Sequence, residues 1–370
     1  MNYLAFAQLI LGLMLLTLGA EALVRGAARL AAALGVSPLI IGLTVVAFGT
    51  SSPELAVSVI ASLDQQMDIS VGNVVGSNIF NILFILGVSA MVAPLTVATQ
   101  IIRLDVPLMI LASVLVLAFG WDKVISLWEG GVLFAGIFAY IAFLIYTARK
   151  EYNQTQEFER EFGRLTAFNF WAGLWNCILV GLGLGLLVLG SRWLVDGAAA
   201  VARSLGVSEL VIGLTIVAAG TSLPELATSV VASLRGERDI SVGNIVGSNI
   251  FNLLAVLGGS ALASFHGLIV SESALRFDIP VMIAAAFACW PVFYKGFDIS
   301  RWEGAAFVLS YFAYVGYLIL AALRPEIVPM ANSAMLFFVL PLTLLTLAVV
   351  LWQGICKQGL PHRALRKNPR

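Results

Sequence analysis

Two short motifs, each present twice, contain the polar residues of this chain that could carry chemistry. GTSSPE at 49–54 returns as GTSLPE at 220–225, and DISVGNVVGSNIFN at 68–81 returns as DISVGNIVGSNIFN at 239–252, both 171 positions later. In the longer motif 13 of 14 residues are identical. Shared hydrophobicity would preserve apolar character rather than individual Asn, Ser, Pro and Glu residues, so we expect each copy to build half of one site.

The shorter motif places a carboxylate, Glu54 or Glu225, inside an apolar segment. An ionised side chain there costs several kcal/mol unless it faces the interior of a helix bundle and finds partners. A carboxylate near a helix end that reaches interfacial water is the alternative. The context Gly-Thr-Ser-x-Pro-Glu, which is the same in both copies, favours a functional role.

The proline before each glutamate predicts a break in the helix, because Pro53 and Pro224 cannot donate a backbone hydrogen bond. Unpaired carbonyl groups at membrane depth are tolerated only where protein or a water-filled cavity satisfies them, and cations can also do so. The released carbonyl groups are expected around Ala47, Thr50, Ala218 and Thr221, with hydroxyl groups beside each glutamate from Ser51 and Ser222.

The longer motif predicts a polar stripe on a neighbouring helix, since its polar residues recur every four positions. The stripe consists of Asn73, Ser77 and Asn81 in the first copy and of Asn244, Ser248 and Asn252 in the second. The glycines between them, Gly72 and Gly76 or Gly243 and Gly247, form GxxxG, which lets another helix backbone approach closely. Interhelical hydrogen bonding that serves packing alone is the alternative interpretation.

Together these groups are hard oxygen donors: carboxylates, hydroxyls, amide oxygens and backbone carbonyls. Such a set suits Ca²⁺, which takes about six to eight oxygen ligands, better than it suits a soft metal. Neither histidine, His266 or His362, lies in the motifs. The cysteines, Cys177, Cys289 and Cys356, lack metal-ligand spacing. Zinc and copper are therefore disfavoured.

The elements that position these residues are predicted to be transmembrane helices. Hydrophobic residues make up 60% of the chain, charged residues 11%, and the mean hydropathy is +0.97, far from the balance of a soluble globular domain. Eleven apolar runs are long enough to cross about 30 Å of hydrocarbon. They lie near 3–24, 38–62, 69–92, 104–120, 126–147, 170–194, 210–234, 241–264, 277–294, 302–323 and 333–355. We expect an all-α polytopic membrane protein.

The basic residues predict an orientation. With the N-terminus outside and the C-terminus in the cytoplasm, sixteen Lys and Arg lie on the cytoplasmic side and five on the other, as the positive-inside rule favours. Each repeat then has five spans, an odd number, so the second copy enters the membrane from the opposite side. Inverted repeats of this kind are typical of secondary transporters with a site near the midplane.

Four parts of the chain follow from this arrangement. They are a first five-helix repeat at 1–147, a cytoplasmic linker at 148–168, a second, inverted five-helix repeat at 169–324, and an extra transmembrane helix with a basic cytoplasmic tail at 325–370.

The other repeated acids are predicted to have structural roles. Asp68 and Asp239 precede the third and eighth spans in an N-cap context, with a vestibule that gathers cations as the alternative. Four more acids open spans, where they would complement helix dipoles and anchor the interface. These are Asp105, Asp278, Glu129 and Glu303.

At the two motifs the chain resembles the cation/Ca²⁺ exchanger superfamily, and within it the prokaryotic Na⁺/Ca²⁺ exchangers. The resemblance covers ten of the eleven spans. It implies a Na⁺/Ca²⁺ exchanger-like fold of two inverted five-helix repeats, in which the first and sixth helices slide past the rest. It implies Glu54 and Glu225 as central metal ligands. The flanking ligands that it implies are Thr50, Ser51, Ser77, Asn81, Thr221, Ser222, Ser248 and Asn252, with backbone carbonyl groups of Ala47 and Ala218 on the ion path.

One departure from this family concerns charge. Some members have Asp in one copy where this chain has Asn at both Asn81 and Asn252. Two carboxylates neutralise one Ca²⁺, two Na⁺ or two protons, whereas three Na⁺ would leave an excess positive charge that carbonyl dipoles would have to carry.

The leading hypothesis is a secondary antiporter that exchanges Ca²⁺ for Na⁺ at one midplane site. An antiporter of H⁺, or of another monovalent cation, against Ca²⁺ is the alternative, with the same glutamates titrating. A remote alternative is an intramembrane lipid-phosphate phosphatase, which would need phosphate-binding cations, usually Arg. Neither motif contains Arg or Lys. We therefore expect no enzyme.

The expected partners are Ca²⁺, Na⁺ and the lipid bilayer. We expect no cofactor, no nucleic acid and no obligate protein partner. The short central linker favours a prokaryotic source and hence a location in the plasma (inner) membrane.

Overall fold

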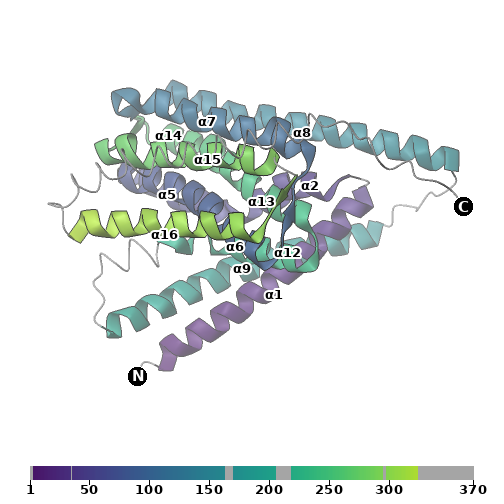
Figure 1. Cartoon of the computed structure of the whole chain (residues 1–370), viewed down its shortest axis with the longest axis horizontal. Coiled ribbons are helices and arrows are strands. Elements are labelled where there is room, and N and C mark those ends of the chain that lie inside the picture. The colour runs from purple at the N-terminus through teal and green to yellow at the C-terminus, as the bar shows by residue number, and fades with distance from the viewer. Residues whose placement is uncertain (1–2, 35, 163–169, 206–217, 295–296, 324–370) are drawn as a thin grey trace, which may run out of the picture.

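The computed structural model describes residues 3–34, 36–162, 170–205, 218–294 and 297–323 (Figure 1). They form long helices that run roughly side by side, interrupted by short π-helical turns and four two-residue strands. The predicted eleventh span at 333–355, the basic tail and the start of the seventh span lie outside these residues.

The first repeat contains α1 (Tyr3–Leu34), α2 (Pro38–Ile41), η1 (Gly42–Val46), α3 (Ala47–Thr50), α4 (Ser52–Leu63), α5 (Met67–Ile79), η2 (Phe80–Leu86), α6 (Gly87–Val92), β1 (Leu95–Thr96), η3 (Ile101–Asp105), α7 (Val106–Phe119), η4 (Gly120–Asp122), β2 (Val124–Ile125) and α8 (Leu127–Phe162). The second contains α9 (Phe170–Ser204), α11 (Ala218–Gly220), α12 (Leu223–Arg235), α13 (Arg238–Phe251), η6 (Asn252–Val256), α14 (Leu257–Ala263), β3 (Leu268–Ile269), η7 (Ala274–Asp278), α15 (Ile279–Tyr294), β4 (Asp298–Ile299) and α16 (Arg301–Leu323).

The predicted membrane spans are confirmed as far as the described residues extend. Within them, eight helices are long and apolar enough to cross a membrane, and Pro38–Thr50 with Ser52–Leu63, which are bent by 44° at their break, are together a ninth candidate. α8 is longer than its predicted span, because its 36 residues continue to Phe162 through the first part of the predicted linker.

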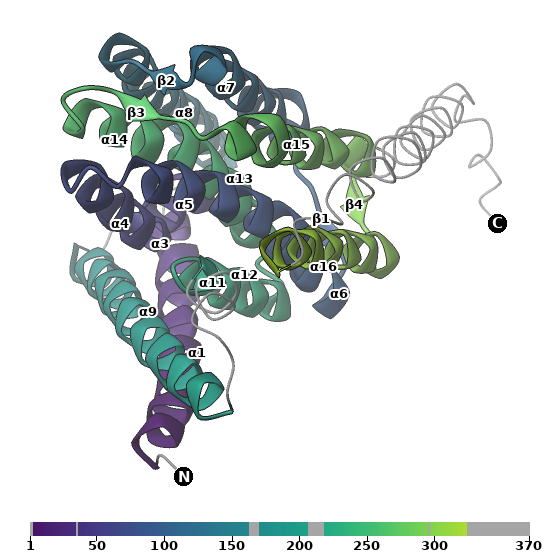
Figure 2. The ribbon, with the colours of Figure 1, turned by 90° about the vertical axis from the view of Figure 1, so that its left-hand side faces the viewer.

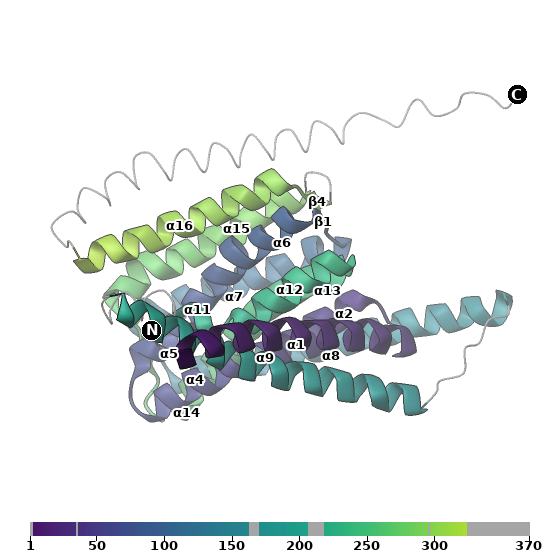
Figure 3. The same ribbon diagram turned by 90° about the horizontal axis from the view of Figure 1, so that it is seen from below.

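The strand pairing shows that the two repeats are inverted. β1 follows the third span and pairs antiparallel with β4, which follows the ninth, and β2 pairs with β3 in the same crosswise way. If the repeats ran in the same direction, β1 and β3 would lie on one side of the membrane, since they follow equivalent spans. Instead, each side carries one strand from each repeat, and Figures 2 and 3 show the β1–β4 pair at one end of the helices. We call the two ends the β1–β4 face and the β2–β3 face.

The bundle has two parts. α1 and α9 lie side by side along one edge, antiparallel to each other (Figure 2). α2, α3, α5, α7 and α12 pack around α13, in which every residue from Ile240 to Phe251 is buried. α16 is at the opposite extreme, because only 11% of the most apolar 18 residues in this helix are buried. Its exposed apolar residues suit contact with lipid.

Glycines set the distance between α1 and α9. Gly12 and Gly19 of α1 lie against Gly190 and Gly183 of α9, so that a Cβ added to Gly183 would lie 2.7 Å from the amide nitrogen of Leu23. Only glycine permits such an approach, and this close packing of backbones is typical of small-residue interfaces in membranes.

The GxxxG prediction is confirmed in the second copy. Cβ atoms on Gly243 and Gly247 would meet the backbone of Leu39 and Leu43 at 3.1 Å and 2.9 Å. The equivalent partner of the first copy would be residues 210–218, most of which lie outside the described residues. That half stays a prediction.

The predicted N-cap role of Asp68 and Asp239 is wrong. The N-caps are Gln66 and Glu237, so both aspartates lie within the first turn of α5 and α13. They still face the positive end of the helix dipole there.

The other span-opening acids fall into two classes. The Oε2 atoms of Glu129 and Glu303 accept hydrogen bonds at 2.8 Å from the backbone N–H groups of Ser126 and Ser300, which makes each a capping box. Asp105, however, is fully buried, and Tyr140 donates to it at 3.0 Å. The prediction of an interfacial anchor is wrong for Asp105, because its carboxylate lies inside the bundle.

The interface between α1 and α9 gives a first test. Gly183→Ala places a methyl group against the α1 backbone and should lower the unfolding free energy by about 1–3 kcal/mol through overpacking. Gly185→Ala is the matched control, because a Cβ there meets nothing within 4 Å. It should gain about 0.5–1 kcal/mol from helix propensity. The measurement is the thermal midpoint of the protein in detergent, and equal midpoints for the two variants would contradict the packing described.

Candidate ion-binding site

The two glutamates of the repeated motif lie just after breaks in their helices. Ser51, with φ −84° and ψ 5°, separates α3 from α4, and Ser222, with φ −91° and ψ 9°, precedes α12. Glu54 and Glu225 therefore occupy the first turns of α4 and α12, and both are fully buried. The N–H groups and the positive dipole end of each half-helix stabilise a negative charge at this place.

The two copies contact each other crosswise. The Ser51 hydroxyl of the first repeat donates to Glu225 Oε1 at 2.8 Å. The Ser222 hydroxyl of the second repeat donates to Glu54 Oε1 at the same distance, 2.8 Å. Each carboxylate is thus held by the serine of the other repeat, and the four side chains form a single cluster.

Two asparagines brace this cluster. Asn73 Nδ2 donates to the Ser58 hydroxyl at 2.8 Å and to the Glu54 carbonyl at 3.2 Å, while its Oδ1 accepts from Thr221 at 3.4 Å. Asn244 repeats the pattern in the second copy, with Ser229 at 2.9 Å, the Glu225 carbonyl at 3.4 Å and Thr50 at 3.0 Å. Both amides are therefore fully used in holding α4 and α12 against α5 and α13.

The serines that accept hydrogen bonds from these amides were not predicted from the motifs. Ser58 and Ser229 lie one helical turn after the glutamates and are fully buried. The signal was available, since both follow their glutamate by four positions in each copy.

The carbonyl groups that the prolines release lie between the predicted positions, at Gly49 and Gly220. The Ala47 carbonyl still accepts the Ser51 N–H at 3.0 Å, so the helical bond there is intact. The group that loses its partner lies four residues before the proline. The Gly49 carbonyl accepts from the Ser52 hydroxyl at 2.6 Å, and the Gly220 carbonyl accepts from the Ser191 hydroxyl of α9, also at 2.6 Å. Ala218 opens α11.

Several polar atoms around the glutamates are buried without a hydrogen-bond partner in the described residues. They are Glu54 Oε2, Glu225 Oε2, Ser248 Oγ, Asn81 Oδ1 and both amide atoms of Asn252. Buried polar atoms are almost always satisfied in native proteins, and leaving one unpaired is costly. Apart from the amide nitrogen of Asn252, the set consists of carboxylate, hydroxyl and amide oxygens, which are the donors that a hard cation prefers.

The contacts of the polar stripe on α5 and η2 differ from those of its repeat equivalent on α13 and η6. The Ser77 and Ser222 hydroxyls are hydrogen-bonded to each other at 3.1 Å, whereas Ser248, the equivalent of Ser77, has no such bond among the described residues. Asn81 Nδ2 donates to Asn249 Oδ1 at 3.0 Å. Asn81 and Asn252 both lie in π-helical turns, η2 and η6, which are frequent at functional sites. The motif predicted neither these turns nor the contact with Asn249.

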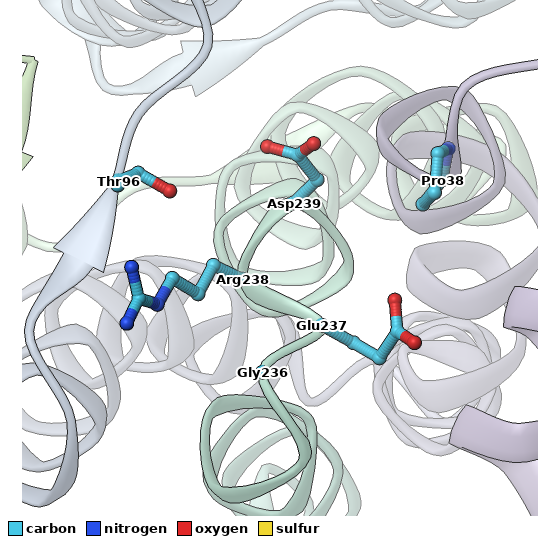
Figure 4. Close-up of a pocket in the computed structure, with 6 residues that line it drawn as sticks. All are labelled: Pro38, Thr96, Gly236, Glu237, Arg238 and Asp239. Atoms are coloured by element: carbon cyan, nitrogen blue, oxygen red, sulfur yellow. The ribbon is translucent and has the colours of Figure 1, made fainter.

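A surface pocket of about 280 Å³ lies at the β1–β4 face. Pro38, Thr96 and the residues 236–239 line it, and Figure 4 shows the Asp239 carboxylate pointing between Pro38 and Thr96. Asp239, the acid considered above for a vestibule, therefore borders a pocket, but it does so at the end of α13 rather than among the buried glutamates.

Comparison with known protein families shows the family of this chain. The model of the family described as "Sodium/calcium exchanger protein" matches this chain twice, at residues 4–147 and 175–320. This chain belongs to the sodium/calcium exchanger family. Because the family's members are transporters, it is a membrane antiporter and not a lipid-phosphate phosphatase.

Individual exchangers and related proteins support the assignment. The sodium/calcium exchanger MaX1 of Methanosarcina acetivorans is 36% identical over 341 residues, which are 84% of this chain and 97% of that protein. The inner membrane protein YrbG of Escherichia coli (strain K12) is 40% identical over 298 residues, 78% of this chain and 89% of that protein.

The fold is also that of a solved exchanger. The sodium-calcium exchanger NCX_Mj, soaked with zero Na⁺ and Ca²⁺, superposes with a TM-score of 0.74 at 31% identity, covering 86% of this chain and all of that one. With 10 mM Na⁺ and 10 mM Sr²⁺ the TM-score is 0.73. The predicted architecture of inverted five-helix repeats is thus confirmed for an exchanger of this family.

The crosswise serines give a second test. Ser51→Ala and Ser222→Ala each remove a hydrogen bond to a charged group, worth about 1.5–3 kcal/mol, and should each weaken Ca²⁺ binding about tenfold or more. Pseudo-symmetry predicts similar losses for the two. Ser310→Ala, which removes a hydroxyl that bonds only its own helix on exposed α16, is the control. Equilibrium ⁴⁵Ca²⁺ binding in detergent measures the effect, and unchanged affinity in both site variants would argue against this geometry.

Proposed function

We propose that this exchanger moves Ca²⁺ against Na⁺ by alternating access at one central site in which Glu54 and Glu225 are the main ligands. The crosswise contacts of Ser51 with Glu225 and of Ser222 with Glu54 support this proposal most directly. They bring the carboxylates of both repeats into one buried cluster, where two negative charges without a cation would repel each other. A divalent cation between them neutralises both.

The proposed ligand set follows from the atoms that surround the glutamates. The second oxygens of both carboxylates, together with Ser248, Asn81 and Asn252, have buried atoms that lack a partner among the described residues. Hydroxyl groups that already donate a hydrogen bond keep lone pairs for a cation. The complete proposed set is Glu54, Glu225, Thr50, Ser51, Ser77, Asn81, Thr221, Ser222, Ser248 and Asn252, with the backbone carbonyl groups of Ala47 and Ala218.

Charge balance constrains the exchange. The proposed ligands contain two carboxylates, and Asn81 and Asn252 are neutral. One Ca²⁺, two Na⁺ or two protons each give a neutral site, and a buried site in low dielectric favours neutrality. Competition for the same two charges is what couples the two ions, because the site holds either Ca²⁺ or the monovalent ions during each crossing.

The proposed location is the plasma membrane of a prokaryote, with the N-terminus outside. In this orientation the β1–β4 face is cytoplasmic, since Arg235, Arg238 and Arg301 lie at that end of their helices.

Charge-neutral substitutions test the central ligands. Glu54→Gln and Glu225→Gln keep the side-chain shape but remove one of the two charges, so each should reduce Ca²⁺ exchange in proteoliposomes by at least a hundredfold. Glu272→Gln is the control. Glu272 is an exposed acid at the β2–β3 face that pairs with Lys123 and Arg276, and the hydrogen bond from Lys123 lowers the pKa of its carboxyl. Wild-type ⁴⁵Ca²⁺ flux in both site variants would defeat the proposal.

The coupling ion is tested separately. With the membrane potential clamped, ⁴⁵Ca²⁺ uptake should follow an imposed Na⁺ gradient in the absence of a pH gradient. Uptake that follows only the pH gradient would instead assign H⁺/Ca²⁺ exchange to the same glutamates.

A further inference from the structure

The two repeats are related by inversion, but they do not have the same contacts. α1 packs along α12, whereas their repeat equivalents, α9 and α4, barely touch. Ala227 and Val231 of α12 are partly buried against a hydrophobic cluster that includes Leu16, Ala20 and Leu23 of α1. The residue equivalent to Val231 is Ile60 of α4, and it is 58% exposed. The structure is therefore closed between α1 and α12 and open between α9 and α4.

An ion pair fastens the closed contact at the β1–β4 face. Glu21 of α1 accepts a hydrogen bond from Arg235 Nε at 2.9 Å and pairs with the same guanidinium through Nη2. Arg25, one turn further along α1, pairs with Glu21 as well. Arg235 is the last residue of α12, so this cluster ties the α1 helix to the end of the broken helix that begins at the site.

The repeat offset of 171 positions maps this cluster onto residues of opposite charge. LTLG at 16–19 of α1 matches LVLG at 187–190 of α9 in the same register as the motifs. Glu21 then corresponds to Arg192, Arg25 to Asp196, and Arg235 to Asp64. All three charges are reversed together, so the equivalent positions remain complementary: an arginine on α9 and an aspartate at the end of α4.

Asp64 and Arg192, the repeat equivalents of Arg235 and Glu21, do not pair with each other in this structure. Asp64, Arg192 and Asp196 are all exposed, and none of them forms an ion pair within the part of the chain that the structure describes. Asp64 follows α4 at the β2–β3 face, where Met67 of the next helix accepts a hydrogen bond from Ile269 of β3. The two clusters thus lie on opposite faces of the membrane, one formed and one open.

We propose that the pairs Glu21–Arg235 and Asp64–Arg192 are alternating locks of the transport cycle, of which only one is closed at a time. This inference rests on the proposed alternating access. Because α1 and α9 are joined through glycines at backbone contact (Figure 3), they move as one body. A movement that parts α1 from α12 therefore brings α9 onto α4, and the inverted symmetry makes the second contact the counterpart of the first.

The locks set the balance between the two access states rather than the affinity for ions. Exposed ion pairs are weak, so losing one should change the ratio of the states by up to about fivefold. Glu21→Gln or Arg235→Gln should favour the state in which α9 meets α4. Asp64→Asn or Arg192→Gln should favour the opposite state, the one described here.

Pulsed electron resonance distances between matched spin labels test the proposal. Labels at Arg29 and Leu234 report the α1–α12 contact, and their repeat equivalents, Ala200 and Leu63, report the α9–α4 contact. The background chain has Cys177, Cys289 and Cys356 replaced by alanine. In proteoliposomes that contain saturating Na⁺ or Ca²⁺, we expect the chain without further substitutions to show mainly a short distance for the first label pair and a long one for the second. Glu21→Gln should move part of the first distance distribution to longer distances and part of the second to shorter ones.

Variants in which the charges of each ion pair are reversed are the control for a merely structural role. Because Arg25 also pairs with Glu21, the complete reversal is the triple variant Glu21→Arg, Arg25→Glu and Arg235→Glu. It should restore the wild-type distance populations, as should the triple variant Asp64→Arg, Arg192→Asp and Asp196→Arg. The proposal is overturned if Glu21→Gln leaves both distributions unchanged, if Asp64→Asn shifts them in the same direction as Glu21→Gln, or if the triple variants fail to restore them. Since these distances need no ion flux, failure of the locks is distinguishable from failure of the ligands at Glu54 and Glu225.

Discussion

The burial of two carboxylates at the centre of an apolar bundle is the constraint on which the rest of the structure depends. Glu54 and Glu225 are fully enclosed, and a charge in such a place requires hydrogen bonds, favourable dipoles and a counter-charge. The helix breaks supply the dipoles, since each glutamate lies in the first turn of a half-helix. The serines of the opposite repeat supply the hydrogen bonds. Each glutamate thus accepts a serine hydrogen bond from the opposite repeat, which interlocks the two halves.

Much of this could be predicted from the sequence because duplication preserves polar residues only where both copies need them. The membrane spans, the inversion and the clustering of the two motifs all followed from repeated residues and from the bias of Lys and Arg. The crosswise direction of the serine contacts did not follow, because it depends on how two inverted units cross in space. Spacing along one helix contains no information about that crossing.

Local geometry accounts for the other differences. The prolines free the carbonyl groups of Gly49 and Gly220, as the helical hydrogen-bond pattern requires. The prediction places the released groups around Ala47 and Thr50 and around Ala218 and Thr221, on either side of these glycines. The π-helical turns at Asn81 and Asn252 have no composition that distinguishes them from α-helix. Asp105 was expected at the interface because it begins a span, yet the tyrosine that pairs with it, Tyr140, lies 35 positions away in the chain. Such a pairing becomes visible only when α7 and α8 are packed.

The burial of α13 from Ile240 to Phe251 has a consequence for how the protein is made. This helix has Asn244, Ser248 and Asn249 along its length, Asn252 follows it in η6, and all four are enclosed. Yet α13 belongs to the eighth predicted span, so the ribosome delivers it after most of the helices that surround it have entered the bilayer. The earlier helices must leave room for it, and Thr50 cannot form its hydrogen bond with Asn244 until α13 has been inserted. Assembly of the centre is therefore expected to be a late event in biosynthesis, because the amide partner of Thr50 enters only with α13.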